Sequence, residues 1–195
     1  LVLFALVSSL TPGPNNLMLM ASGANYGFRR SIPHILGVSI GFTLMVLLVG
    51  VGLLQVFDAF PVSYQVLKVS SVIYLLYLAW KIGTAARPNS DTKAESKPFT
   101  FIQAALFQWV NPKAWTMALT GVSIYSPSQS TAAMAFVAGV FGAVNLPCIS
   151  LWTTLGKQLQ ALLTSRARLR AFNIAMAILL VSSLYPVLLS PLRHY

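Results

Sequence analysis

Charged residues, and acidic residues above all, are scarce in this chain. Only 8% of its 195 residues are charged and only three of them are acidic, whereas 56% are hydrophobic. A soluble domain carries about 25% charged residues, so a water-soluble globular protein is excluded. The composition therefore predicts an integral membrane protein.

Cysteine and histidine are nearly absent as well. Cys148 is the only cysteine, which excludes an intramolecular disulfide and a relay between paired thiols. The two histidines, His34 and His194, lie at the edges of different apolar runs and cannot form a metal cluster. A membrane enzyme needs a nucleophile–base pair or a metal cluster inside the membrane, and the sequence shows neither pattern. We therefore expect no enzymatic activity, no cofactor and no metal.

Long apolar runs fill most of the chain. A bilayer core is crossed by a helix of roughly 20 apolar residues. Strands of a membrane barrel would instead alternate with period two over about ten residues, which these runs do not do. The sequence predicts an all-α membrane protein with six transmembrane helices, at about 1–24, 35–57, 66–83, 99–125, 131–154 and 171–192.

Basic residues give the chain a net charge of +10, but they separate the apolar runs and do not gather on one polar domain. Membrane lipid is therefore an expected partner and nucleic acid is not. Ten of the 13 lysines and arginines lie in or beside the first, third and fifth gaps, and Lys113 lies inside a run. Cytoplasmic loops carry the excess of basic residues, so these gaps are predicted to be cytoplasmic and both termini periplasmic.

The first and fourth runs are each interrupted by proline, about a dozen residues in. The first contains "TPGPNN", residues 11–16, and the fourth contains "NPK", residues 111–113. Proline lacks an amide hydrogen and pushes the preceding residue out of the α region. Thr11 and Asn111 are suitable N-caps for a helix that restarts at the following proline. We therefore predict that helices 1 and 4 are broken.

Interrupted segments at matching positions in two halves indicate the binding site of an inverted-repeat transporter. The amides of restarted helices and the Lys113 ammonium suit an anionic group, whereas free carbonyls and asparagine oxygens suit a cationic one. A zwitterion fits this pattern best. Simple proline kinks, and a Lys113 side chain that extends to the outer interface, are the alternatives. The predicted substrate-binding residues are those of the two breaks: Thr11, Pro12, Gly13, Pro14, Asn15, Asn16, Asn111, Pro112 and Lys113.

Three further side chains near the breaks have open roles. Asn145 could form a hydrogen bond to a break or a structural bond between helices. Gln108 and Trp115 flank the second break and could shape a pocket or only pack. The sequence does not decide between these roles.

The polar stretch "ARPNSDTKAESKP" divides the chain. It predicts one transmembrane transporter domain over residues 1–195, with halves of about 1–85 and 98–195 and a cytoplasmic linker at 86–97. Each half holds three predicted spans, and because three is odd the halves are inserted in opposite orientations. The expected architecture is a 3+3 inverted repeat with broken helices 1 and 4.

Four segments, "LTPGPNNLMLMASGANYGFRRS", "GVSIGF", "YLLYLAWKI" and "FQWVNPKAW", follow one another along nearly the whole chain. In this order they resemble the lysine exporter and homoserine–threonine exporter family of bacterial amino-acid efflux proteins, nearest the branch of cysteine and O-acetylserine exporters. The resemblance implies a multi-pass protein of the bacterial inner membrane. It also implies export of small amino acids or their derivatives, driven by the proton gradient.

The energy coupling is not evident from the residues. Proton relays usually use intramembrane carboxylates, but Asp58 lies at the end of the second run and the other two acids lie in the linker. Lys113, Asp58 and water bound at the breaks all stay open as relays. A passive channel or facilitator for small zwitterions is the main alternative to a secondary transporter, and a membrane-embedded enzyme is a weaker one.

Overall fold

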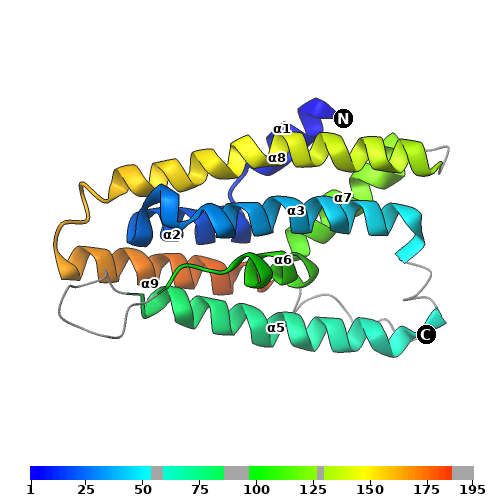
Figure 1. Ribbon diagram of the computed structural model, residues 1–195. Helices are drawn as coiled ribbons and strands as arrows, with labels where there is room; N and C mark the ends of the chain where they lie inside the picture. Colours follow the sequence, from blue (N-terminus) through cyan, green and yellow to red (C-terminus); the bar gives the residue numbers. More distant parts are fainter. Residues whose placement is uncertain (54–58, 86–96, 127–129, 186–195) are drawn as a thin grey trace.

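The structure, a computed structural model, describes residues 1–53, 59–85, 97–126 and 130–185. Within these ranges every regular element is a helix, as predicted (Figure 1). In chain order they are α1 Val2–Leu10, α2 Pro14–Arg30, α3 Ile32–Leu48, the π-helical segment η1 Val49–Leu53, α5 Pro61–Gly83, α6 Phe101–Val110, α7 Pro112–Tyr125, α8 Thr131–Leu159 and α9 Arg166–Ser182.

Three helical stretches in this part of the chain are long and apolar enough to cross a membrane, namely Arg29–Gly52, Gln65–Gly83 and Thr131–Leu159. The first and fourth predicted spans are not continuous helices, because each is divided in two by its break. The sixth predicted span holds α9, which has 17 described residues. The protein is thus an all-α membrane protein.

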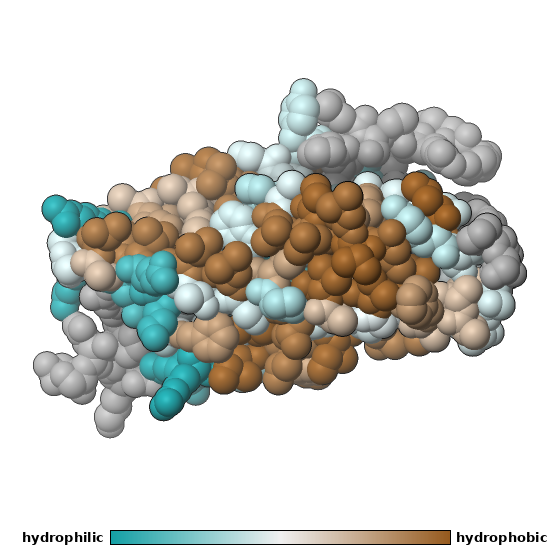
Figure 2. Space-filling model, turned by 90° about the horizontal axis from the view of Figure 1, so that it is seen from above, coloured by the Kyte–Doolittle hydropathy of each residue, from teal (hydrophilic) through white to brown (hydrophobic). Residues whose placement is uncertain are grey.

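The outside of the bundle is apolar along its flanks. Figure 2 shows hydrophobic side chains over the middle of the molecule and hydrophilic ones gathered at one end. The ends of α2, α5 and α8 and the start of α9 lie together at that end, the left end in Figure 1. The basic residues of these segments, such as Arg30, Lys81 and Arg166, therefore share one end of the bundle.

Glycines let the helices on either side of the breaks pack closely. A Cβ on Gly23 of α2 would collide with the Thr153 carbonyl oxygen of α8, and one on Gly156 would collide with the Met20 carbonyl oxygen. A Cβ on Gly37 of α3 would likewise collide with the backbone of α6. Small residues allow such close backbone approach in membranes, so α2 with α8 and α3 with α6 form a tightly packed framework.

Apolar side chains form two large clusters. One is built mainly on α2, α5, α6 and α9 and includes Met18, Leu78 and Phe107. The other is built on α1, α3, α7 and α8 and includes Phe42 and Phe141. Because α1 and α7 belong to one cluster and α2 and α6 to the other, both helix breaks lie at the boundary between the clusters.

The observed helices differ from the predicted spans mainly at their ends. α8 extends to Leu159, beyond the predicted limit at 154, and α9 begins at Arg166, before the predicted start at 171. The Ser165 side chain accepts a hydrogen bond from the Arg168 amide at 3.2 Å and so sets the start of α9. Residues 54–57 and 186–192 of the predicted runs, and residues 86–96 of the linker, lie outside the described residues.

Candidate substrate site at the two helix breaks

The first break separates α1 from α2 by residues 11–13. Gly13, in an extended conformation, is the N-cap of α2, and Pro14 is its first residue. The prediction that Thr11 caps the restarted helix is therefore wrong. Either proline could begin a helix by local rules, but Pro14 takes that position and Pro12 lies in the connection. Thr11 instead ends α1, where its hydroxyl donates to the Ser8 carbonyl at 2.9 Å.

The second break is a single residue, Asn111, between α6 and α7. Its side-chain oxygen accepts a hydrogen bond from the Lys113 amide at 3.1 Å, and Pro112 is the first residue of α7. The predicted N-cap at Asn111 is confirmed. The backbone amide of Lys113 is consequently engaged in this cap, whereas the Lys113 side chain extends toward the first break.

The last carbonyls of α1 receive donors from outside that helix. The Asn16 side-chain amide donates to the Ser9 carbonyl at 2.9 Å and to the Thr11 carbonyl at 2.8 Å. The Trp152 indole of α8 donates to the Leu10 carbonyl at 3.3 Å. A helix that ends within a membrane needs such partners, because lipid supplies none.

The Lys113 side chain crosses from the second break to the first. Its Nζ donates to the Thr11 carbonyl at 2.5 Å, to the Thr11 hydroxyl at 3.0 Å and to the Pro12 carbonyl at 3.4 Å. The ammonium thus lies at the C-terminal end of α1, where the helix dipole is negative. The Lys113 side chain therefore extends toward the first break.

Gly13 makes room for this contact. A Cβ at position 13 would lie 2.6 Å from Cδ and 3.1 Å from Nζ of Lys113. The backbone of Gly13 is extended, with φ −171°, so any residue could adopt its conformation. The requirement for glycine here is therefore space for the lysine side chain.

A pair of side-chain amides joins α2 to α6 between the breaks. Asn15 Nδ2 donates to Gln108 Oε1 at 2.8 Å, and Gln108 Nε2 donates back to Asn15 Oδ1 at 3.1 Å. Gln108 also donates to the Ala104 carbonyl at 2.9 Å and is fully buried. Gln108, whose role the sequence left open, thus fixes the position of Asn15.

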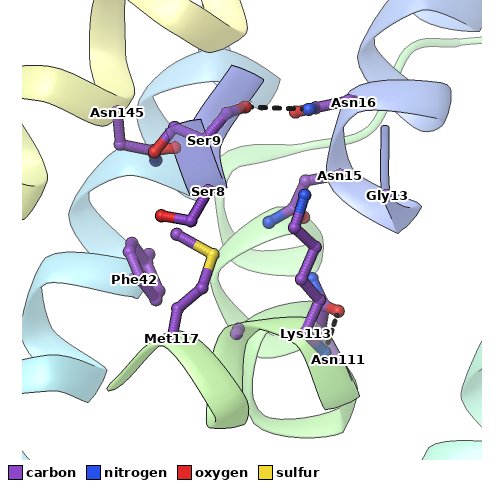
Figure 3. Close-up of a pocket in the computed structure, with 11 residues that line it drawn as sticks. Ser8, Ser9, Gly13, Asn15, Asn16, Phe42, Asn111, Lys113, Met117 and Asn145 are labelled. Carbon is purple, nitrogen blue, oxygen red and sulfur yellow. Dashed lines mark hydrogen bonds between the residues drawn. The ribbon is translucent and has the colours of Figure 1, made fainter. Parts of the chain in front are cut away.

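A small cavity lies where the two breaks meet (Figure 3). Its volume is about 20 Å³, which by this measure holds a water molecule and is too small for an amino acid. It is lined by residues of both breaks and of α1, α2, α3, α7 and α8: Ser8, Ser9, Gly13, Asn15, Asn16, Phe42, Asn111, Lys113, Ala114, Met117 and Asn145.

The predicted site residues come together in space. Those that line the cavity are Gly13, Asn15, Asn16, Asn111 and Lys113. The others adjoin it, as partners of Lys113 or as the first residues of the restarted helices: Thr11, Pro12, Pro14 and Pro112. Their role in substrate binding stays a prediction.

Sequence reasoning missed the apolar and hydroxyl-bearing walls of the cavity. Ser8 and Ser9 stand just before the first break in "VSSL", which was an available signal. Phe42, Ala114 and Met117 carried no local signal, because their position depends on how the helices pack. Asn145, left open by the sequence, lines the cavity.

The electrostatics of the cavity are set by one charge. Lys113 is the only titratable side chain among the lining residues. Its hydrogen-bond partners are the neutral oxygens of Thr11 and Pro12, and all three acidic residues of the chain lie outside the described ranges. In the part of the chain that the structure describes, no group of three or more metal-ligating side chains occurs. The cavity can therefore attract an anionic group.

A helical membrane bundle with a polar cavity at the junction of two interrupted helices is the arrangement of a membrane translocator. The model of the LysE type translocator family matches residues 6–183, and the chain belongs to this family. Members of the family are transporters, so the protein is not an enzyme.

Similar proteins include the cysteine/O-acetylserine efflux proteins of Escherichia coli (strain K12), Shigella sonnei (strain Ss046) and Shigella flexneri. Each is 33% identical over 186 residues, an alignment that covers 91% of this chain and 90% of the relative. No solved structure matches the chain.

Proposed function

We propose that this protein is a secondary transporter that exports small amino acids or their derivatives from the cytoplasm across the bacterial inner membrane. The observation that carries the proposal is the Lys113 ammonium, which lies in a cavity lined by amide side chains and beside the carbonyls of a helix end. This set of groups complements a zwitterion. Relatives that are named as efflux proteins for cysteine and O-acetylserine support the same substrate class.

The proposed architecture has six spans arranged as a 3+3 inverted repeat. The spans are α1 with α2, α3 with η1, α5, α6 with α7, α8, and α9. The halves are about 1–85 and 98–195, joined by the cytoplasmic linker. In support, the breaks fall in the first helix of each half and meet at one boundary between apolar clusters. The basic end of the bundle is taken as cytoplasmic, which leaves both termini periplasmic.

The proposed binding mode is an exchange of partners at Lys113. The carboxylate of the substrate replaces the Thr11 and Pro12 carbonyls as the acceptor of the Lys113 ammonium. The ammonium of the substrate then takes the two carbonyls that Lys113 has left. A zwitterion carries no net charge, so the exchange adds no charge to the site, and each ionic group keeps a hydrogen-bond partner.

The small volume of the cavity favours a carrier over an open channel. A cavity of about 20 Å³ must widen before an amino acid can enter. α1 is the wall best able to move, because it exposes Leu3, Leu6 and Val7 and buries only Ala5 and Ser9. A substrate that releases Lys113 from α1 would let this half-helix move. Substrate binding would thereby be linked to the widening of the cavity.

Inside-out membrane vesicles test the proposal, because export then becomes uptake. We expect vesicles with the protein to accumulate cysteine or O-acetylserine when their interior is acidic, and a protonophore to abolish the accumulation. A passive facilitator would only equilibrate the substrate. Vesicles with the Lys113→Met protein should take up no substrate. Lys157→Met changes an exposed lysine at the end of α8, and vesicles with this control protein should take up substrate at the wild-type rate. The proposed function would be refuted if, for every small amino acid, vesicles with the wild-type protein took up no more than protein-free vesicles.

A further inference from the structure

We propose that Ser9 and Asn145 form a subsite for the substrate side chain, which selects small amino acids whose uncharged side chain can form a hydrogen bond. The inference rests on the proposed function, since it assigns part of the same cavity. It concerns selectivity between amino acids, whereas the residues of the two breaks bind the groups that all amino acids share.

Two buried polar atoms at the cavity have no hydrogen-bond partner among the described residues. They are Ser9 Oγ on α1 and Asn145 Nδ2 on α8. Ser9 is 3% exposed and Asn145 is 5% exposed, and both residues line the cavity. Buried polar groups are nearly always paired, because an unpaired one has lost its water without compensation. Two such groups facing one cavity indicate a ligand that completes them.

The two groups lie apart from the charged part of the cavity. Figure 3 shows Ser9 and Asn145 on one side and Lys113 with Asn15 on the other. An amino acid whose carboxylate contacts Lys113 therefore directs another part of itself toward Ser9 and Asn145. For a molecule of this size that part is the side chain.

The chemistry of the subsite defines the class of side chain. Asn145 Nδ2 offers a donor, and the Ser9 hydroxyl offers both a donor and an acceptor. A hydroxyl, a thiol or an ester oxygen can pair with these groups, whereas an alkyl group of the same size leaves both unpaired. A cationic side chain finds no carboxylate among the lining residues, and Phe42 and Met117 restrict the length. The subsite therefore disfavours basic and aliphatic amino acids.

Ser126 supplies a matched control. Its hydroxyl is also buried and without a partner in the described structure, but it lies at the end of α7 and does not line the cavity. If a buried unpaired hydroxyl were only a defect of packing, Ser9→Ala and Ser126→Ala would behave alike. A subsite requires that only Ser9→Ala changes which amino acid is transported.

The experiment compares cysteine with 2-aminobutyrate, which has a methyl group in place of the thiol. Purified wild type, Ser9→Ala, Asn145→Leu and Ser126→Ala are reconstituted in proteoliposomes, and the ratio of the two transport rates is measured for each. Serine against alanine, which lacks the hydroxyl, is a second pair. The ratio of the two rates is compared at equal amounts of inserted protein, so differences in expression between the variants do not affect it.

We expect the wild type and Ser126→Ala to prefer the polar member of each pair. Ser9→Ala and Asn145→Leu should lower that preference by about tenfold, as expected when a buried hydrogen bond is lost. A transporting Ser9→Ala protein with an unchanged ratio would overturn the subsite and leave the proposed function intact, whether or not Asn145→Leu inserts. Wild-type protein that transports none of the four amino acids would overturn the subsite, and it would overturn the proposed function as well if O-acetylserine and the other small amino acids are not transported either.

Discussion

The first helix break is held by side chains from distant segments in addition to one neighbour, whereas the second is held by its own neighbours. At the first, Lys113 of α7 and Trp152 of α8 donate alongside the nearby Asn16, and Gly13 provides no side-chain cap. At the second, Asn111 caps the helix that follows it, and the Trp115 indole donates to the Trp109 carbonyl at 2.8 Å. The two breaks look alike in sequence, but only the first depends on contacts that a ligand can replace.

In the proposed binding mode, this difference gives the two breaks different parts in transport. The second break is then a fixed platform from which Lys113 extends. The first break is then the part that moves, since α1 loses a hydrogen bond when Lys113 turns to a substrate. Four predictions, taken from the largest expected effect on export to the smallest, test this division.

Gly13→Leu should abolish export, because its side chain would occupy the space of Lys113 Cδ and Nζ. The measurement is uptake of cysteine by inside-out vesicles. Gly139→Leu is the control, since a Cβ at that position of α8 meets nothing within 4 Å. Normal uptake by the Gly13→Leu protein would show that the contact between the breaks is not needed.

Asn16→Ala should loosen α1, because it leaves the Ser9 and Thr11 carbonyls without their amide donor. The expected loss of stability is about 1–3 kcal/mol, concentrated at the first break. Hydrogen exchange should therefore become faster in α1 and stay unchanged in α6. Equal acceleration in both helices would contradict the separate roles of the breaks.

The Asn15–Gln108 pair should contribute a smaller and measurable coupling. Polar pairs between membrane helices contribute about 0.6 kcal/mol on average. A double-mutant cycle with Asn15→Leu and Gln108→Leu, followed by unfolding in mixed micelles, measures this coupling directly. Strictly additive single effects would show that the reciprocal amide contact does not stabilise the junction of α2 and α6.

Trp115→Phe should have the smallest effect on export. It removes one hydrogen bond, to the Trp109 carbonyl, at a cost of about 0.5–1.5 kcal/mol. Because the second break is the fixed platform, the export rate should stay close to that of the wild type while the melting temperature falls slightly. A large loss of transport at normal stability would place Trp115 in the moving part of the protein.

Much of the fold and part of the site could be predicted from the sequence. The helices, the two breaks and the Asn111 cap have local causes, namely apolar runs, prolines and a polar residue before proline. The start of α2 at Pro14 was missed because Pro12 and Pro14 satisfy the same local rule. With the helix starting at Pro14, the Thr11 carbonyl accepts hydrogen bonds from Asn16 and Lys113. These contacts depend on the folded arrangement and cannot be read from the local sequence.

The other walls of the cavity could not be predicted from the local sequence either, because they too depend on the folded arrangement. Phe42 and Met117 lie in apolar runs like many other residues, and only the crossing of α3 and α7 brings them to the breaks. Asn145 was noticed as a polar residue in an apolar helix. Its position opposite Ser9 required the packing of α1 against α8.

The most direct test of the central claim is an experimental structure of the protein with a bound small amino acid. The account predicts that the carboxylate of the ligand lies within hydrogen-bond distance of Lys113 Nζ, and that this atom has left the Thr11 carbonyl. A ligand bound away from the breaks, or a Lys113–Thr11 contact that persists beside a bound ligand, would contradict it.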